Sequence, residues 1–325
     1  MGTVVATAPE PTRARKFTKL WRDGDQIAHF VTFLFAASIF LVTVFLVYEL
    51  WIHSGPSRAK FGFSFLTGKV WDPVAEQFGA LPFIYGTVLT SLIALLISVP
   101  LGVGAAIFLA ELAPPQLSNA CTFLVELLAA VPSVIFGLLA IFTLVPIMRQ
   151  YVEPFLKGAL GFLPLFQGPA YGVGYLTAGL ILSIMTFPFI ISISREALLA
   201  VPREQREAAL ALGATKWEST WQVVVPFARL GIIGSVFLAL ARALGETMAV
   251  TMVIGNHPSI SKSLFAPANT LASVIAGEFS EATSDLYLSA LIEIGLALFL
   301  VTIIVNAIAR LMVWAVTRNA PARVH

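Results

Sequence analysis

Apolar residues in this chain come in long, nearly unbroken runs. A helix of about 20 mostly apolar residues is needed to cross the hydrocarbon core of a bilayer. Six stretches of the sequence reach that length, with expected bounds of 28–51, 84–112, 120–148, 172–194, 230–254 and 286–314. The bilayer core holds no water that could bond the backbone N–H and C=O groups. Spanning segments of this length therefore form helices, in which these groups bond to one another. The pattern therefore predicts an all-α, polytopic membrane protein with six transmembrane helices.

The composition supports this class and excludes others. Of 325 residues, 58% are hydrophobic and only 12% are charged, whereas a soluble domain has about 25% charged residues. The net charge of +2 is small and the basic residues do not form a stripe, so we expect no nucleic-acid partner. A single cysteine, Cys121, excludes an internal disulfide and any zinc site built from paired cysteines. We expect membrane lipid around the chain, and neither a metal nor a cofactor held within it.

The distribution of Lys and Arg predicts which loops face the cytoplasm. Cytoplasmic loops of membrane proteins carry an excess of these residues. With six spans, the segments on one side hold twelve of them and those on the other side hold six. Both termini are therefore expected in the cytoplasm. The expected organisation is a cytoplasmic tail at 1–27, a first transmembrane helix at 28–52, an extracytoplasmic loop at 53–83, a five-helix core at 84–316 and a cytoplasmic tail at 317–325.

The first span is expected to be retained. Its apolar run is longer than the about 7 to 15 residues of a signal-peptide core, and no small-residue cleavage site follows it. The loop after it contains aromatic residues from Phe61 to Phe65 and at Trp71. Exposed aromatics of this kind either sit at the membrane interface or form a docking ledge for a partner.

A hydrophilic segment at 202–225 interrupts the apolar pattern on the cytoplasmic side. Pro202 suits the first turn of a helix, and Gly213 suits the left-handed residue that ends one. Thr215 and Glu218 stand three residues apart, the spacing of a capping box that opens a second helix. We therefore expect two short helices joined by a tight turn. We expect the second helix to end at the proline that follows this segment.

The residues alone leave two interpretations of this hairpin open. Exposed Leu212 and Trp217 would fit a groove on another protein. Alternatively, the first helix lies as an amphipathic helix on the lipid surface.

The hairpin carries a family pattern. Glu207-Ala208-Ala209, three residues, Gly213, nine residues and then Val223-Val224-Val225-Pro226 resemble the EAA loop of ABC-importer permeases, E-A-A-x3-G-x9-I-x-L-P, with valines in place of Ile and Leu. In that family the loop sits in a cleft of the cytoplasmic ATPase subunit. The resemblance implies a set of residues that couple this chain to an ATPase: Glu207, Ala208, Ala209, Gly213, Thr215, Trp217 and Glu218.

Further motifs, at 78–82, 86–91, 127–133 and 241–247, resemble the PstC-type permeases of phosphate-specific ABC importers, and the resemblance covers about residues 25–318. It implies a MetI-like permease core in the bacterial cytoplasmic (inner) membrane. It also implies three kinds of partner: a homologous PstA-type permease, a PstB-type ATPase dimer and an extracytoplasmic PstS-type phosphate-binding protein. The chain has no G-x-x-x-x-G-K-[ST] loop. We therefore expect a transporter subunit that is not itself an enzyme, with ATP and Mg bound by the partner ATPase.

Two charges in the fifth span are candidates for the substrate pathway. Arg242 is expected near the middle of that span, where a charge costs at least about 2.5 to 3.5 kcal/mol unless it faces protein or water. Glu246 follows one helical turn later on the same face. The pair is either structural, each charge neutralising the other, or it binds substrate. A guanidinium fork matches phosphate oxygens, and a carboxylate can accept the proton that phosphate carries and sulfate lacks.

Two other residues are weaker candidates for the pathway. Pro132 interrupts the third span, and Ser133 beside it offers a hydroxyl at the expected bend. Glu126 lies earlier in the same span and either pairs with a neighbouring helix or lines the cavity.

Two rival functions remain after the sequence analysis. One is a permease of the same family for another oxyanion, such as sulfate or molybdate. The other is an ion-coupled secondary transporter in which Arg242, Glu246 and Glu126 relay protons.

Overall fold

The computed structural model describes residues 13–318, and for residues 27–314 it also describes the side chains. In this part of the chain, six helices are long and apolar enough to cross a membrane, over 27–53, 81–112, 133–160, 175–199, 216–245 and 285–314. The prediction of an all-α protein with six such helices is confirmed. Of the two predicted tails, residues 1–12 and 319–325 lie outside the described residues.

The chain forms two compact units, divided between Ile52 and His53. The first unit contains the helix α1 (Arg13–His53) except for its last residue, and this helix begins well inside the predicted 1–27 tail. From residue 27 onwards its apolar side chains are exposed on all sides of the helix. A helix that is apolar all round is typical of a membrane span.

The second unit contains the remaining elements. Its α-helices are α2 (Gly55–Phe61), α3 (Ser64–Thr67), α4 (Leu81–Ile107), α5 (Pro115–Ala129), α6 (Ser133–Leu139), α7 (Val145–Ile147), α8 (Glu153–Leu160), α9 (Tyr175–Leu199), α10 (Arg203–Ala211), α11 (Lys216–Ser219), α12 (Val225–Gly245), α13 (Met248–Val253), α14 (Leu271–Glu278) and α15 (Asp285–Arg318). Between them lie the π-helical segments η1 (Phe108–Leu112), η2 (Ala140–Leu144), η3 (Met148–Val152) and η5 (Thr220–Val224), and the short 3-10 helix η4 (Pro164–Phe166).

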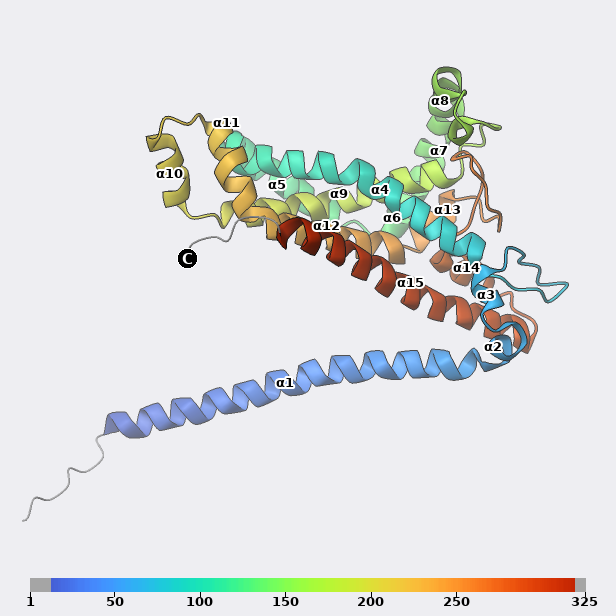
Figure 1. The fold of residues 1–325 in the computed structure, drawn as a ribbon, viewed down its shortest axis with the longest axis horizontal. Helices are drawn as coiled ribbons and strands as arrows, with labels where there is room; N and C mark the ends of the chain where they lie inside the picture. The colour runs from blue at the N-terminus through green and yellow to red at the C-terminus, as the bar shows by residue number, and fades with distance from the viewer. Residues whose placement is uncertain (1–12, 319–325) are drawn as a thin grey trace, which may run out of the picture. The chain divides into compact units, whose positions relative to one another are not determined.

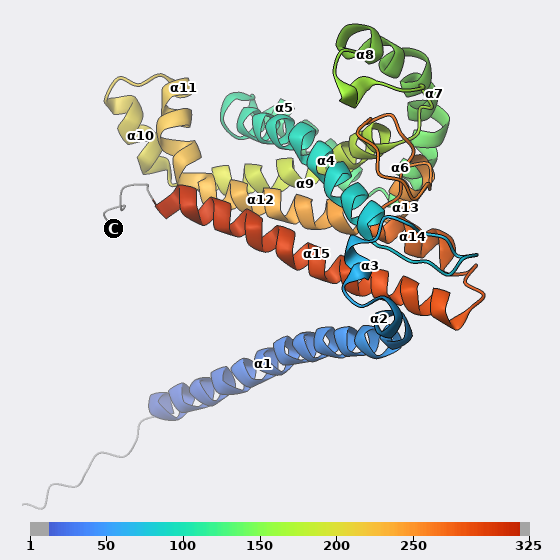
Figure 2. The same cartoon turned by 45° about the vertical axis from the view of Figure 1, so that its right-hand side comes forward.

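Four long helices, α4, α9, α12 and α15, run side by side through the second unit (Figures 1 and 2). Helix α9 packs against both α4 and α12, and its residues Tyr175, Ala178, Ile181, Leu182 and Met185 are buried in one core. Two glycines allow α4 and α9 to approach closely, because a side chain at either would collide with an isoleucine: Gly102 faces Ile190 and Gly179 faces Ile93. Small residues at such contacts are typical of membrane helix packing.

The loops of the second unit gather at two opposite ends (Figure 1). The hairpin end carries α10, α11 and the turn between η1 and α5. The opposite end carries α2, α3, α8 and α14. This division agrees with the alternation that the Lys and Arg distribution predicts for the loops.

The predicted third span is not one helix. The sequence predicted a helix over 120–148, but α5 ends at Ala129 and α6 starts at Ser133. Pro132 lacks an N–H and disfavours helical backbone at the residue before it, so the helix breaks completely where a bend was expected. The continuous apolar helix runs from Ser133 to Leu160.

The predicted fifth span is also broken and shifted. Its helix begins at Lys216, passes through η5 and ends at Gly245, followed by the separate short helix α13. The second helix of the hairpin therefore continues into this span and does not end at Pro226. The proline is accommodated in the first turn of α12, after the π-helical segment, where its missing N–H costs little.

The aromatic residues of the loop at 53–83 do not have the exposed role that the sequence predicts for them. Phe65 and Trp71 are buried in a core at the opposite end, and the Trp71 ring packs edge-on against Phe83 with centroids 4.9 Å apart. The Trp71 indole N–H donates to Glu278 at 2.8 Å. Only Phe63 of this set is almost fully exposed, at 92%. Phe65 and Trp71 thus belong to the protein core and do not form an exposed aromatic surface.

Candidate functional site

The hairpin at 202–225 has the local structure that its sequence predicts up to its last turn. Helix α10 ends at Ala211, and Gly213 has φ +90°, the left-handed region that glycine adopts without strain. The Thr215 N–H donates to the Glu218 carboxylate at 2.8 Å, and the Glu218 N–H donates to the Thr215 hydroxyl at 3.3 Å. Both halves of the capping box are therefore present.

The outer face of this hairpin is exposed. Glu207, Ala208, Gly213, Thr215 and Glu218 are all exposed, and Ala209 is half-buried. The apolar side chains expected to fit a partner also face outward: Leu212 is 91% exposed and Trp217 is 56% exposed. Trp217 packs edge-on against Trp221, with ring centroids 5.5 Å apart.

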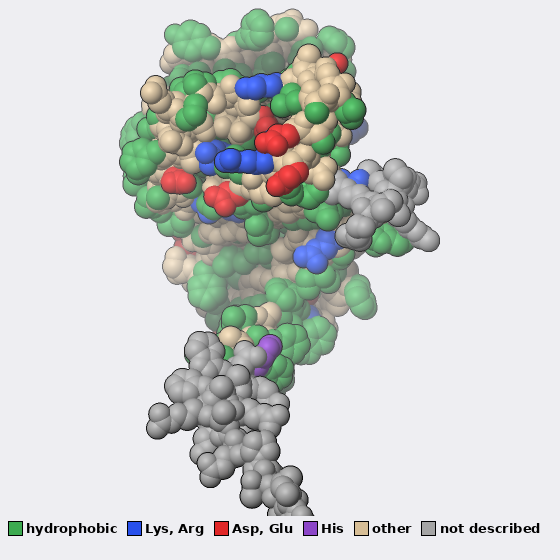
Figure 3. All heavy atoms as spheres, turned by 90° about the vertical axis from the view of Figure 1, so that its left-hand side faces the viewer, with side chains coloured by type: hydrophobic (Ala, Val, Ile, Leu, Met, Phe, Trp, Pro, Cys, Tyr) green, Lys and Arg blue, Asp and Glu red, His purple; other side chains and the backbone are tan. Residues whose placement is uncertain are grey.

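Charged side chains of both signs gather on the face at the hairpin end, with hydrophobic side chains among and beside them (Figure 3). Exposed apolar side chains beside charges of both signs make a surface suited to a protein groove.

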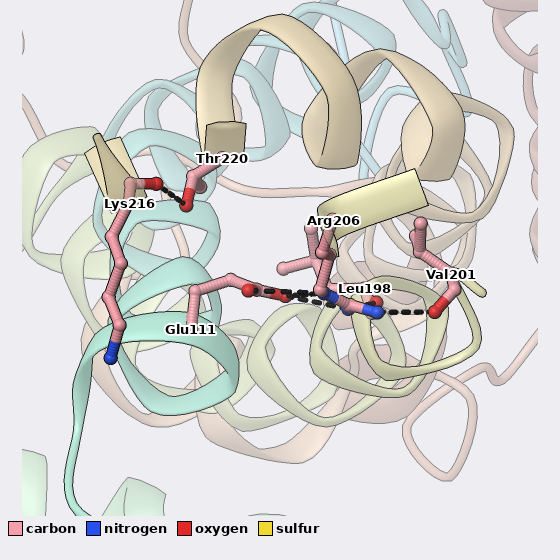
Figure 4. A network of polar contacts seen from close by, with 6 residues as sticks. All are labelled: Glu111, Leu198, Val201, Arg206, Lys216 and Thr220. Carbon is pink, nitrogen blue, oxygen red and sulfur yellow. Dashed lines mark hydrogen bonds and ion pairs between the residues drawn. The ribbon is translucent and has the colours of Figure 1, made fainter. Parts of the chain in front are cut away.

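The base of the hairpin is held by an ion pair that the sequence analysis missed. Arg206 on α10 donates from Nη2 to Glu111 Oε1 at 2.7 Å and from Nε to Oε2 at 3.3 Å (Figure 4). The same guanidinium donates to the Leu198 carbonyl at 2.7 Å and to the Val201 carbonyl. Arg206 thus joins α10 to the end of α9 and to η1.

A sequence signal for this pair exists. Glu111 lies at the end of the second apolar span, and Arg206 lies in a loop that the charge distribution places on the same side of the membrane. Opposite charges at the ends of neighbouring spans are candidates for pairing, but the sequence did not show which residues of the two loops meet.

Arg242 lies in the last turn of α12, not near the middle of its span. Its guanidinium carbon sits 4.4 Å from the centroid of the Phe189 ring on α9. The Nε atom is buried and has no hydrogen-bond partner among the described residues. A guanidinium stacked on an aromatic ring keeps its N–H donors free for another ligand.

Glu246 is not on the same helical face as Arg242, because the helix ends at Gly245 and Glu246 has extended backbone. One carboxylate oxygen accepts the Ala249 N–H of α13 at 3.4 Å. Within the described residues, no ion pair joins Glu246 to Arg242. The expectation of a pair one turn apart on one face is therefore wrong, since it assumed that the helix continues.

The two weaker candidates occupy different surroundings. Ser133 is the first residue of α6 and is half-buried. Glu126 lies on an exposed position of α5.

The helix breaks before α6 and α13 belong to one structural region. The two short helices pack on each other at Gly137, where an added Cβ would lie 3.2 Å from the Ala249 Cα. Ser133 and Glu246 therefore stand at the starts of two packed half-helices.

A comparison with protein families decides the class. The model for "Binding-protein-dependent transport system inner membrane component" matches residues 98–318, which include the exposed hairpin and both helix breaks. The chain belongs to this family. It is a multi-pass inner membrane permease subunit, and its resemblance to PstC-type permeases is confirmed by its relatives.

Similar curated proteins cover almost the whole chain. "Phosphate transport system permease protein PstC" of Mesorhizobium japonicum is 49% identical over 302 residues, which is 92% of this chain and 92% of the relative. The protein of the same name from Xylella fastidiosa is 50% identical over 262 residues, 79% of this chain and 81% of the relative. That of Haemophilus influenzae is 46% identical over 307 residues, 93% and 96% of the two chains.

Solved structures show the same fold at low sequence identity. A chain of a bacterial ABC transporter involved in the import of the acidic polysaccharide alginate aligns with a TM-score of 0.55 and 16% identity, over 90% of this chain and 98% of that one. A chain of the MetNI methionine ABC transporter in an inward-facing conformation aligns with a TM-score of 0.50 and 18% identity, over 70% and 93%. The second unit therefore has the MetI-like ABC-importer permease fold.

Proposed function

We propose that this chain is the transmembrane permease subunit of an ATP-driven importer of inorganic phosphate. The observation that carries the proposal is the 49% identity to a phosphate transport permease over 92% of both chains. Near-half identity over 92% of both chains extends to the spans and loops that would contact substrate and partners. Similarity of fold alone gives no information about those contacts.

The proposal assigns the exposed hairpin to the ATPase partner. In this proposal the hairpin faces the cytoplasm, as do the two termini of the chain. The apolar side chains Leu212 and Trp217 enter a cleft of a PstB-type ATPase that binds ATP and Mg. A PstA-type permease completes the pathway, and a PstS-type protein delivers phosphate at the opposite end. ATP binding draws the hairpins of the two permeases together, and the cavity between the permeases opens to the outside. ATP hydrolysis opens it to the cytoplasm again.

The proposal assigns Arg242 to phosphate. A half-buried Arg242 guanidinium, stacked on Phe189, has a buried Nε that no described residue accepts from, and so presents a positive charge with a free donor. Such a site binds an oxyanion through charge-assisted hydrogen bonds. Binding must stay weak, because a tight intramembrane site would not release its substrate.

The test is phosphate uptake by membrane vesicles that contain this chain with its co-expressed ATPase, second permease and binding protein. We expect ATP-dependent uptake of phosphate that a tenfold excess of sulfate does not reduce. The variant Glu207→Arg with Gly213→Trp should lose both ATPase co-purification and uptake, since it alters charge and bulk on the exposed face of the hairpin. Sulfate competition would favour the other-oxyanion permease, and uptake without the ATPase would favour an ion-coupled transporter.

A further inference from the structure

We propose that Arg206 is the positioning residue that makes the coupling hairpin move together with α4 and α9. The inference rests on the proposed function, because it describes how a displacement of the hairpin reaches the transmembrane helices. One guanidinium joins three elements: it belongs to α10 and contacts both η1 and the end of α9 (Figure 4).

The guanidinium of Arg206 donates hydrogen bonds in two directions. Towards η1 it meets the Glu111 carboxylate with a forked contact, Nη2 to Oε1 at 2.7 Å and Nε to Oε2 at 3.3 Å. Towards α9 it donates to the Leu198 carbonyl at 2.7 Å and to the Val201 carbonyl. The carbonyls at a helix C-terminus lack partners within the helix, so a cation there satisfies them.

This ion pair differs in environment from the exposed one at the opposite end. The side chains of Arg206 and Glu111 are 20% and 12% exposed. Those of Lys60 and Glu76 are 47% and 44% exposed, with the charged atoms 3.8 Å apart. A partly buried, forked pair resists separation, because removing one partner leaves the other charge poorly solvated. An exposed pair contributes little.

The elements that Arg206 joins could transmit a displacement of α10 to the long transmembrane helices. The end of α4, the end of α9 and the segment η5 at the start of the fifth span share a small core, in which Ile107, Leu198 and Val224 are buried. Glu111 itself lies in η1, a π-helical segment after which the Ala113 N–H donates to the Phe108 carbonyl at 2.8 Å. Such segments recur at functional sites. A displacement of α10 therefore acts on the two most closely packed long helices.

The test is a double-mutant cycle on the assembled importer, with Glu111→Ala, Arg206→Ala and both together. The measured quantity is phosphate taken up per ATP hydrolysed, at equal abundance of the complex and equal ATPase co-purification. We expect each single variant to lower this ratio about fivefold or more, the lower range of coupling between sites. The double variant should be no worse than the more damaging single variant, because both changes break one link.

Lys60→Ala is the matched control, since it breaks the exposed ion pair, and its ratio should stay within about twofold of the wild type. If the single variants do not assemble, the ratio is measured on the double variant, because that variant leaves no unpaired buried charge. An unchanged ratio in assembled variants would overturn the inference. So would a double variant whose loss equals the product of the two single losses.

A second readout separates this inference from the proposed function. If the wild-type complex takes up no phosphate, the substrate assignment fails while the link can still be measured on the purified chain. Trypsin cleavage after exposed Lys216 should then be about fivefold faster in Glu111→Ala than in the wild type or Lys60→Ala, because the hairpin has lost its anchor on η1. Equal cleavage rates would show that Glu111 does not hold the hairpin.

Discussion

The guanidinium of Arg242 has an aromatic ring against one face and a buried Nε without a partner. A buried donor left unpaired costs about 1 to 3 kcal/mol. Such an arrangement is stable when a ligand or water supplies the missing acceptor, and in the proposed function that acceptor is a phosphate oxygen during transport.

Replacing Arg242 by Gln should lower phosphate uptake about tenfold or more. The change removes charge-assisted hydrogen bonds, each of which contributes about 1.5 to 3 kcal/mol. Uptake is measured in vesicles with complex abundance matched by immunoblot. Arg310→Gln is the control, because it makes the same change at an exposed position of another apolar helix. Normal uptake by Arg242→Gln would remove this residue from the pathway.

Glu246→Gln separates a carboxylate that contacts substrate from one that only caps a helix. The amide oxygen of Gln can still accept the Ala249 N–H, so the thermal stability of the purified chain should not change. Phosphate uptake should fall because the amide accepts no proton from the substrate. If uptake is retained together with stability, Glu246 acts as the cap of α13 alone.

At the scale of elements, close backbone approaches determine how the helices are placed. Gly86 of α4 lies against the Asn269 carbonyl, at a distance where an added Cβ would overlap the oxygen. Beside it, the Thr87 hydroxyl accepts the Leu271 N–H of α14 at 2.9 Å. The Gly-Thr pair therefore joins α4 to the loop that begins α14.

Gly86→Ala should destabilise the protein by about 1 to 3 kcal/mol, because the methyl group meets rigid backbone. The matched control lies in the same helix: Gly104 has open space where its Cβ would be, so Gly104→Ala should be neutral or slightly stabilising. Thermal unfolding of the two purified variants in detergent checks the difference. Equal melting temperatures would show that α4 can move away from Asn269 at little cost.

At the scale of the whole molecule, the second unit separates its loops into two ends (Figure 2). Val74 is 96% exposed in the outer loop of the opposite end, and Leu212 is 91% exposed at the tip of the hairpin. In the proposed orientation these two positions lie on opposite sides of the membrane.

We expect Val74→Cys to react with a membrane-impermeant thiol reagent in intact cells, and Leu212→Cys to react only after permeabilisation. Both changes are made in a Cys121→Ser chain expressed without its ATPase, so that the hairpin is uncovered and no native thiol competes. Labelling is read by a mass shift on the purified chain. Reaction of both positions from the same side would contradict the proposed orientation.

Local chemistry made much of this molecule predictable. The lengths of the apolar runs were enough to predict six membrane helices, and the capping box at Thr215 and Glu218 formed as its spacing indicates. The interruptions were harder to predict. Pro132 predicts a disturbed helix, but whether a proline bends or ends a helix depends on the neighbours that satisfy the freed backbone groups. No proline marks the helix break after Gly245 in the sequence. The prediction that Arg242 and Glu246 lie on one face of a continuous helix was therefore wrong.

The sequence by itself determined the membrane class, the loop alternation, the hairpin and the family, because these depend on hydropathy, charge and contiguous motifs. Only the tertiary structure decided that Arg206 meets Glu111, that Arg242 stacks on Phe189 and that Trp71 belongs to the core. Each of these contacts joins residues far apart in the chain, and their pairing follows from how the helices pack. A contact between distant residues produces no periodic pattern in a single sequence. The partner cannot be read from that sequence, because the same helices could be arranged in many ways.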